Sequence, residues 1–222
     1  MRFNERRPLD ADSDEASAKA DYEAVLAGLY DQLLDVYRAV HPTDSNLPTF
    51  GYRIRELLIL FATEVESGMK GILRANSYES QKAAHVSKPK YAKPKRWNAR
   101  DYARLVDAIL LDQWNTGLVR FEEPETRTPF EGWTSSSVPS WWTAYNRTKH
   151  DSEAHLADAT LDAVIDAAAA CFVLGNAAFG YREFMKDQRV FLPVRRGSAR
   201  RIERIRLGND WTPVNFQFDF SV

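Results

Sequence analysis

Residues 141–151 hold, within a short stretch, side chains that could transfer protons and bind an anion. On a helix, Asn146 and His150 are four residues apart and therefore share a face. Histidine has a reference pKa of about 6.5, so it can donate or accept a proton near neutral pH. Lys149 and Arg147 carry positive charge that can hold a phosphate. The stretch therefore predicts a small polar site with His150 and Asn146 as its central pair.

Aromatic side chains accompany this polar cluster. Trp142 and Tyr145 lie close to the same helical face, and Trp141 falls on its flank. A buried aromatic wall beside a few polar groups is a common arrangement for a site, because the wall excludes water and strengthens the polar contacts. We therefore expect Trp142 and Tyr145 to line the site.

The wider pattern extends over about twenty residues. It comprises Pro129-Phe130-x-x-Trp133, then Pro139-x-Trp141-Trp142, then Tyr145-Asn146-x-x-Lys149-His150. This pattern resembles that of a group of uncharacterised bacterial helical proteins. It also resembles a divergent form of the HEPN superfamily, whose motif is an arginine, often followed by a polar residue such as asparagine, with a histidine a few residues later. Asn146 and His150 match the polar residue and the histidine, whereas Tyr145 stands at the arginine position.

The resemblance implies a helical bundle that binds RNA or cuts it without a metal ion or other cofactor, in bacterial defence or a toxin–antitoxin system. RNA cleavage without metal needs an acid, a base and positive charge on the phosphate. The implied site residues are catalytic His150 and Asn146, and substrate-binding Lys149, Arg147, Tyr145 and Trp142. RNA is the implied ligand, a protein antitoxin and a second copy in a homodimer are further expected partners, and no membrane is expected.

A second interpretation is structural. Asn146, Lys149 and His150 would then satisfy buried carbonyl groups of a long loop at residues 115–138, and the two tryptophans would belong to the core. In that case the chain is a non-catalytic interaction or scaffold protein.

The elements that must position these residues follow from hydrophobic spacing. Apolar residues at intervals of three and four predict helices over residues 14–40, 50–75, 99–114, 140–151 and 159–186. Short strands are expected at residues 190–194 and 215–220, where apolar residues cluster or alternate. The expected fold is an all-α, up-and-down bundle of about five helices at residues 14–187. Residues 1–13 are expected to form a loose arm and residues 188–222 a β-rich appendage.

Composition limits the class of protein. The chain has 222 residues, a net charge of −1 and one cysteine, which excludes an internal disulfide. No apolar run suits a signal peptide or a membrane span, so a soluble cytoplasmic protein is expected. The near-neutral charge means that any attraction to nucleic acid must be local. Residues 82–100 and 195–206 are two such basic segments.

Two further groups of residues are candidates for a role. Glu64 and Glu66 lie within an apolar run, and we expect Glu64 to flank the apolar stripe, at the solvent edge or paired with Lys149 or Arg147. His155 follows His150 by five residues, which is not the spacing of two histidine ligands on a helix, and no third metal ligand is evident. No metal site is therefore expected.

Overall fold

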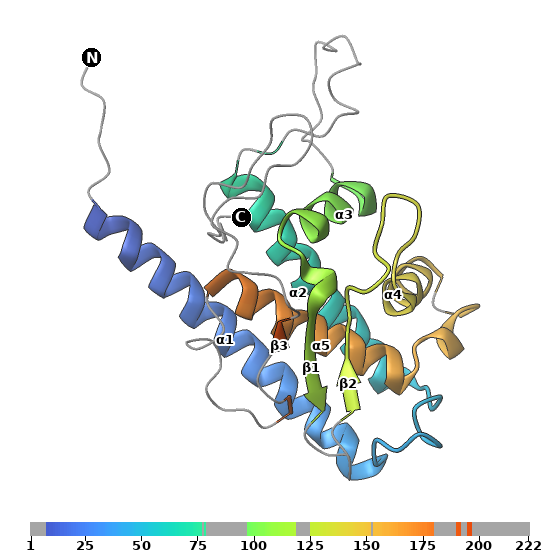
Figure 1. The fold of residues 1–222 in the computed structure, drawn as a ribbon. Coiled ribbons are helices and arrows are strands. Elements are labelled where there is room, and N and C mark those ends of the chain that lie inside the picture. The colour runs from blue at the N-terminus through green and yellow to red at the C-terminus, as the bar shows by residue number, and fades with distance from the viewer. Residues whose placement is uncertain are drawn as a thin grey trace.

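The computed structural model describes residues 8–76, 78, 97–118, 125–151, 153–179, 190–191 and 195–196. Within these residues the chain forms an all-α bundle with a small β appendage, as expected (Figure 1). The helices are α1 (Pro8–Ala39), α2 (Tyr52–Ala75), α3 (Ala99–Ala108), α4 (Ser140–His150) and α5 (Leu161–Phe179). A further predicted stretch of helix, residues 180–186, lies outside the described residues.

Helices α1 and α2 form the antiparallel hairpin that the short loop between them predicts (Figure 1). The guanidinium of Arg53, at the start of α2, donates to Gln32 Oε1 near the end of α1 at 2.8 Å. Helix α1 begins at Pro8 rather than at Asp14, so the second half of the predicted arm is helical. Proline suits a first helical turn, because the N–H that it lacks has no partner there.

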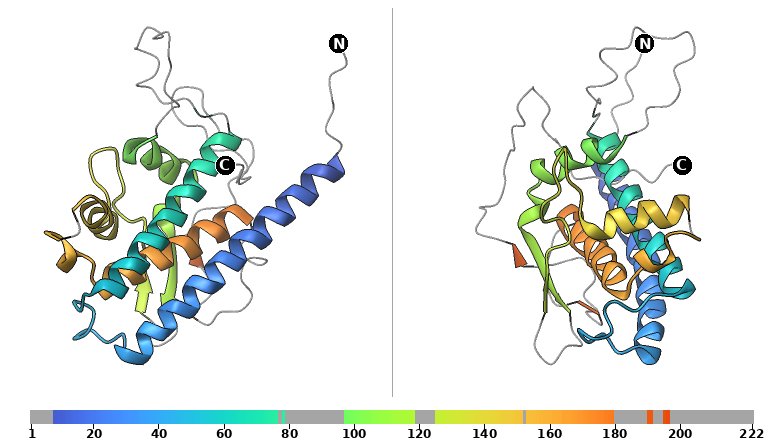
Figure 2. Two further views of the ribbon diagram at one scale, coloured as in Figure 1. Left: turned by 180° about the vertical axis from the view of Figure 1, so that it is seen from behind. Right: turned by 90° about the vertical axis from the view of Figure 1, so that its right-hand side faces the viewer.

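Helix α5 is the centre of the core, and most of its side chains are buried. The sheet lies on one side of α5, and α1 and α2 lie on the other (Figure 2). The hydroxyl of Tyr30, on α1, donates to the Ala168 carbonyl at 3.2 Å. The Cys171 thiol donates to the Phe61 carbonyl, on α2, at 3.2 Å. By length and composition α5 could cross a membrane. However, 83% of its apolar stretch is buried inside the fold, as in the core helix of a soluble protein.

Helix α3 starts where the sequence predicts and ends earlier. The Asn98 side chain accepts from the Arg100 N–H at 2.9 Å, and the Asp101 carboxylate accepts from the Asn98 N–H at 2.9 Å, which forms a capping box. The helix ends at Ala108 because Leu110 adopts a left-handed conformation, with φ of 51°. A short 3₁₀ turn, η2 (Leu111–Gln113), then leads into the sheet.

The sheet replaces the first part of the loop predicted at residues 115–138. Strand β1 (Trp114–Leu118) pairs antiparallel with β2 (Glu125–Arg127) and with β3 (Arg195–Arg196), in the order β2-β1-β3. Buried and half-buried residues alternate along β1, as in a strand with one face on a core. Two of the three strands in the described residues come from the middle of the chain, and the predicted strand at residues 215–220 lies outside the described residues.

Candidate functional site

The candidate site is α4, which forms over the predicted residues directly after Pro139. Its two faces differ sharply. The face toward the bundle is buried and holds Trp141, Trp142, Ala144, Tyr145 and Thr148. The face toward solvent holds Asn146, which is half-buried, and the exposed residues Arg147, Lys149 and His150. Asn146 and His150 do share a face, but the predicted substrate contacts Trp142 and Tyr145 are core residues.

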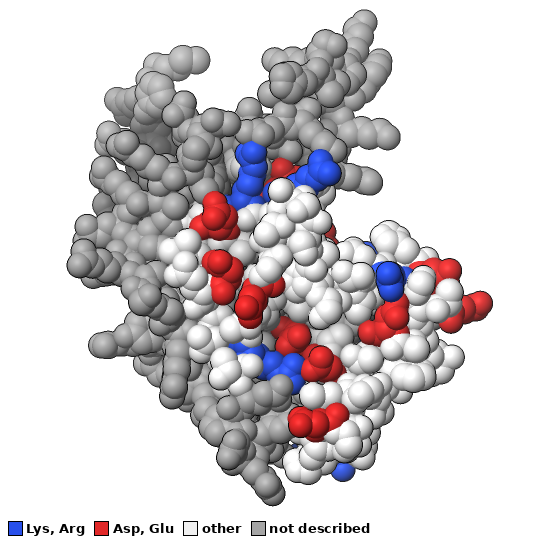
Figure 3. All heavy atoms as spheres, turned by 45° about the vertical axis from the view of Figure 1, so that its right-hand side comes forward, with Lys and Arg blue, Asp and Glu red and all other residues white. Residues whose placement is uncertain are grey.

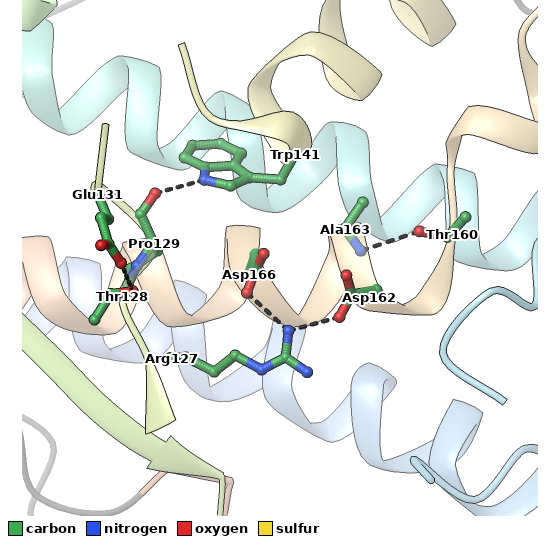
Figure 4. Close-up of polar contacts among 9 residues, drawn as sticks. All are labelled: Arg127, Thr128, Pro129, Glu131, Trp141, Thr160, Asp162, Ala163 and Asp166. Carbon is green, nitrogen blue, oxygen red and sulfur yellow. Dashed lines mark hydrogen bonds and ion pairs between the residues drawn. The ribbon is translucent and has the colours of Figure 1, made fainter. Parts of the chain in front are cut away.

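The tryptophans fasten the segment before α4 to the bundle. The indole N–H of Trp141 donates to the Pro129 carbonyl at 2.7 Å (Figure 4). The indole N–H of Trp133 donates to the Ala99 carbonyl, at the start of α3, at 3.1 Å. The rings of Trp133 and Trp142 lie 4.9 Å apart between centroids, a contact distance for aromatic pairs. One buried carbonyl of the predicted loop, that of Pro129, is therefore satisfied by a tryptophan, and Trp133 joins the same loop to α3.

A polar cluster joins α4 to α2 and α3, and the sequence alone does not reveal it. The Tyr145 hydroxyl donates to Glu66 Oε2 at 3.0 Å, and the Tyr102 hydroxyl donates to Glu66 Oε1 at 3.4 Å. Lys70 forms an ion pair with Glu66 Oε1 at 2.7 Å. Lys149 donates to the Tyr145 hydroxyl at 2.6 Å and lies 3.7 Å from Glu66 Oε2. We call these five residues the Glu66 cluster.

The charges in the Glu66 cluster support one another. Burial disfavours the charge on Glu66, but the hydrogen bond and charge of Lys70, with contributions from Tyr145 and Lys149, outweigh it and lower the pKa of the carboxyl. The hydrogen bond to Tyr145 raises the pKa of Lys149, against the opposing effect of burial. Burial and the charge of Glu66 raise the pKa of Tyr102. The Glu66 carboxylate is therefore ionised and the Lys149 ammonium is charged near neutral pH.

Three donors lie within hydrogen-bonding distance of the Glu66 carboxylate. A carboxylate offers about four acceptor positions, and here two hydroxyls and the Lys70 ammonium occupy three of them, while Lys149, at 3.7 Å, contributes its charge. Glu66 therefore joins the helices, and its lowered pKa makes it a weak base.

Of the two alternatives for Glu64, the pairing with Lys149 or Arg147 does not form among the described residues, because Glu66 takes that place beside Lys149. Residues two positions apart in a helix differ by about 200° around its axis, so Glu64 and Glu66 point in nearly opposite directions. Glu64 lies toward Tyr22 and Cys171, and burial raises its pKa. The spacing of Glu66 and Lys70, four residues apart on one helix, is the sequence signal for the pair that forms.

Apart from Lys149, the polar residues on the solvent face of α4 have few side-chain contacts with the rest of the fold. Within the part of the chain that the structure describes, His150 makes no hydrogen bond or ion pair. Asn146 Nδ2 donates to the Trp142 carbonyl of its own helix at 2.9 Å, so the amide does not orient His150. Arg147 lies 3.4 Å from Asp158. Neither Asn146 nor Lys149 binds a carbonyl of residues 128–138, contrary to the structural interpretation.

A second buried charge lies on the opposite side of α5 from the α1–α2 hairpin. Arg127, on β2, contacts Asp162 at 2.6 Å and Asp166 at 3.0 Å (Figure 4). This cluster ties the sheet to α5. Among the described residues on the face of the molecule drawn in Figure 3, acidic and basic side chains are interspersed among uncharged ones.

Two sequence candidates cannot be placed fully. The basic segments at residues 82–100 and 195–206 lie outside the described residues, apart from residues 97–100 and 195–196. Among the described residues, no group of three or more His, Cys, Asp or Glu side chains is arranged to hold a metal ion.

Comparisons of the chain with protein-family models, with curated proteins and with solved structures find no significant match. The interpretation of α4 therefore depends on its own geometry.

Proposed function

We propose that this chain is an HEPN-like RNA-binding protein that uses the solvent face of α4, with a metal-independent ribonuclease activity centred on His150. The supporting observation is the exposure of His150 beside Arg147 and Lys149 in the last turn of α4, with no internal partner for the imidazole among the described residues. A purely structural motif has no need for an exposed imidazole in the same turn as two cations. Cytoplasmic location, a homodimer and an antitoxin partner belong to the same proposal.

The chemistry of the site follows from these side chains. An exposed imidazole is free to take the proton of a ribose 2′-hydroxyl, and in its protonated form it can give a proton to the leaving oxygen. Arg147 and Lys149 supply positive charge for the phosphate. The side-chain oxygen of Asn146 can accept a hydrogen bond from a nucleotide, because the bond to the helix uses only its Nδ2.

Cleavage of total RNA by the wild type and by His150→Ala tests the catalytic part of this proposal. His155→Ala is the matched control, because His155 is a nearby partly exposed histidine that is paired with Asp158 at 3.2 Å. We expect cleavage in the presence of a chelator by the wild type and His155→Ala, and none by His150→Ala. Unchanged cleavage by His150→Ala, or none by the wild type, would exclude a ribonuclease centred on His150.

A non-catalytic scaffold is the second candidate. It is supported by the bond from Trp141 to Pro129 and by the bond from Tyr145 to Glu66, because both use buried residues of the α4 motif to hold neighbouring segments. Limited proteolysis of Trp141→Phe tests it. The scaffold role predicts faster cleavage within residues 128–138 than in the wild type. Unchanged protection of this segment would argue against a fastening role for Trp141.

A further inference from the structure

Lys149 is held unusually firmly for a lysine at the surface. Its ammonium donates to the Tyr145 hydroxyl at 2.6 Å and lies 4.8 Å from the centre of the same ring. Tyr145 is fully buried, and its hydroxyl is fixed in turn by the bond to Glu66. A lysine normally moves freely on a four-carbon stem. Here the buried Tyr145 and the half-buried Glu66 hold the ammonium, although 45% of the Lys149 side chain is exposed.

The cluster around this ammonium carries surplus positive charge. Glu66 is one carboxylate shared by two lysines, which leaves one unneutralised positive charge. Lys70 is the closer partner, at 2.7 Å against 3.7 Å for Lys149. Glu66 therefore neutralises the charge of Lys149 less than that of Lys70, and Lys149 can attract an external anion. An ammonium has three N–H donors, and the hydrogen bond to Tyr145 uses one of them.

The position of Lys149 suits a phosphate next to the candidate acid and base. Lys149 directly precedes His150, and both lie in the last turn of α4 with Arg147. The Arg55 guanidinium, from α2, donates to the Thr148 carbonyl at 3.4 Å and adds a further cation at this end of the helix. An anion bound here would meet positive charge from two helices.

We propose that Tyr145 and Glu66 are positioning residues that hold the Lys149 ammonium as the phosphate-binding cation of the RNA site. This role rests on the proposed RNA-binding function. Tyr145 does not touch the RNA itself, because it is buried. It acts through Lys149, so the tyrosine at the arginine position of the motif holds a lysine that supplies the positive charge for a phosphate.

The salt dependence of binding to a fluorescent single-stranded RNA tests the lysine. Loss of one phosphate contact lowers the slope of log affinity against log salt by about 0.7. We expect this change for Lys149→Gln and a wild-type slope for Lys149→Arg, which keeps the charge. Arg38→Gln is the control, since it removes an exposed cation from α1. Its slope should equal that of the wild type.

A double-mutant comparison tests the positioning role. Tyr145→Phe removes only the hydroxyl, and we expect it to weaken RNA binding about three- to tenfold. Tyr145→Phe combined with Lys149→Gln should bind no more weakly than Lys149→Gln alone, because the hydroxyl acts through the lysine. Glu66→Gln provides a second positioning variant with the same expected non-additivity, and circular dichroism verifies that each variant is folded.

The outcomes separate this inference from the function on which it rests. Wild-type binding with an unchanged slope in Lys149→Gln would overturn the inference and leave RNA binding intact. Additive losses in the double variants would assign Tyr145 and Glu66 a structural role only. No RNA binding by the wild type would overturn the proposed function, and the inference with it.

Discussion

The hydroxyl of Tyr145 donates to Glu66 Oε2 at 3.0 Å and thereby joins α4 to α2 at a buried point. This bond lies at the boundary between the two faces of α4. On the buried face of α4, aromatic residues pack into the core, and on the solvent face Lys149 and His150 are exposed. The stability of the bundle and the geometry of the proposed RNA site therefore depend on the same contact.

Removal of the Tyr145 hydroxyl should destabilise the fold. In Tyr145→Phe, Glu66 loses a donor and the ring keeps its packing, so we expect a loss of about 1–3 kcal/mol in the free energy of unfolding. Urea denaturation measures this loss. Tyr52→Phe is the matched control, because its ring is mostly exposed and its hydroxyl should contribute little. Equal stabilities of the two variants would contradict the buried bond.

Acid should weaken the Glu66 cluster. The pKa of Glu66 is lowered in the folded protein, so folding favours its ionised form. That stabilisation is fully present above the usual glutamate value of 4.5 and is lost as the pH falls through the lower, folded pKa. The wild type should therefore lose more stability than Glu66→Gln between about pH 6 and about pH 3. If thermal unfolding showed the wild type and Glu66→Gln losing stability in parallel as the pH falls, this linkage would be refuted. Glu56→Gln is the control, because Glu56 is an exposed carboxyl on the same helix.

The two adjacent tryptophans of α4 should respond differently to replacement. Trp141→Phe removes the donor to the buried Pro129 carbonyl, whereas the Trp142 indole N–H makes no hydrogen bond among the described residues. Both rings are buried, so each variant loses similar apolar area. We expect Trp141→Phe to cost about 1–2 kcal/mol more than Trp142→Phe in chemical denaturation. A reversed order would show that the Pro129 bond contributes little.

Much of the fold could be predicted because its signals are local. The apolar spacing of three and four marks α2, and Asn98 followed by Asp101 marks the start of α3. Strand β1 could not be predicted because Asn115 and Gly117, which have low strand propensity, hide its alternation. The pairing of Glu66 with Tyr145 depends on how α4 crosses α2, and a single sequence does not contain that geometry.

The left-handed conformation of Leu110 should reverse the usual ranking of substitutions. At φ of 51° a Cβ atom is strained, and glycine avoids this strain. We therefore expect Leu110→Gly to be more stable than Leu110→Ala by about 1 kcal/mol, although glycine normally destabilises. Thermal unfolding of the two variants tests this order. A more stable alanine variant would contradict the backbone conformation that ends α3.

Arg127 should depend more on Asp166 than on Asp162. Asp166 is 19% exposed and Asp162 is 45% exposed, so water can screen and replace the second carboxylate more easily. Asp166→Asn should therefore lower the free energy of unfolding by about 1–3 kcal/mol, and Asp162→Asn by less than about 1 kcal/mol. Equal losses would mean that the two carboxylates share the buried guanidinium evenly.

The central claim is that the solvent face of α4 binds RNA, and fluorescence anisotropy with a labelled single-stranded RNA tests it most directly. We predict that the wild type binds and that Arg147→Gln combined with His150→Ala weakens binding at least about tenfold, whereas Arg38→Gln does not. Both changes lie at exposed positions, so the fold should survive them. Absent wild-type binding, or equal binding by the double variant, would contradict the claim.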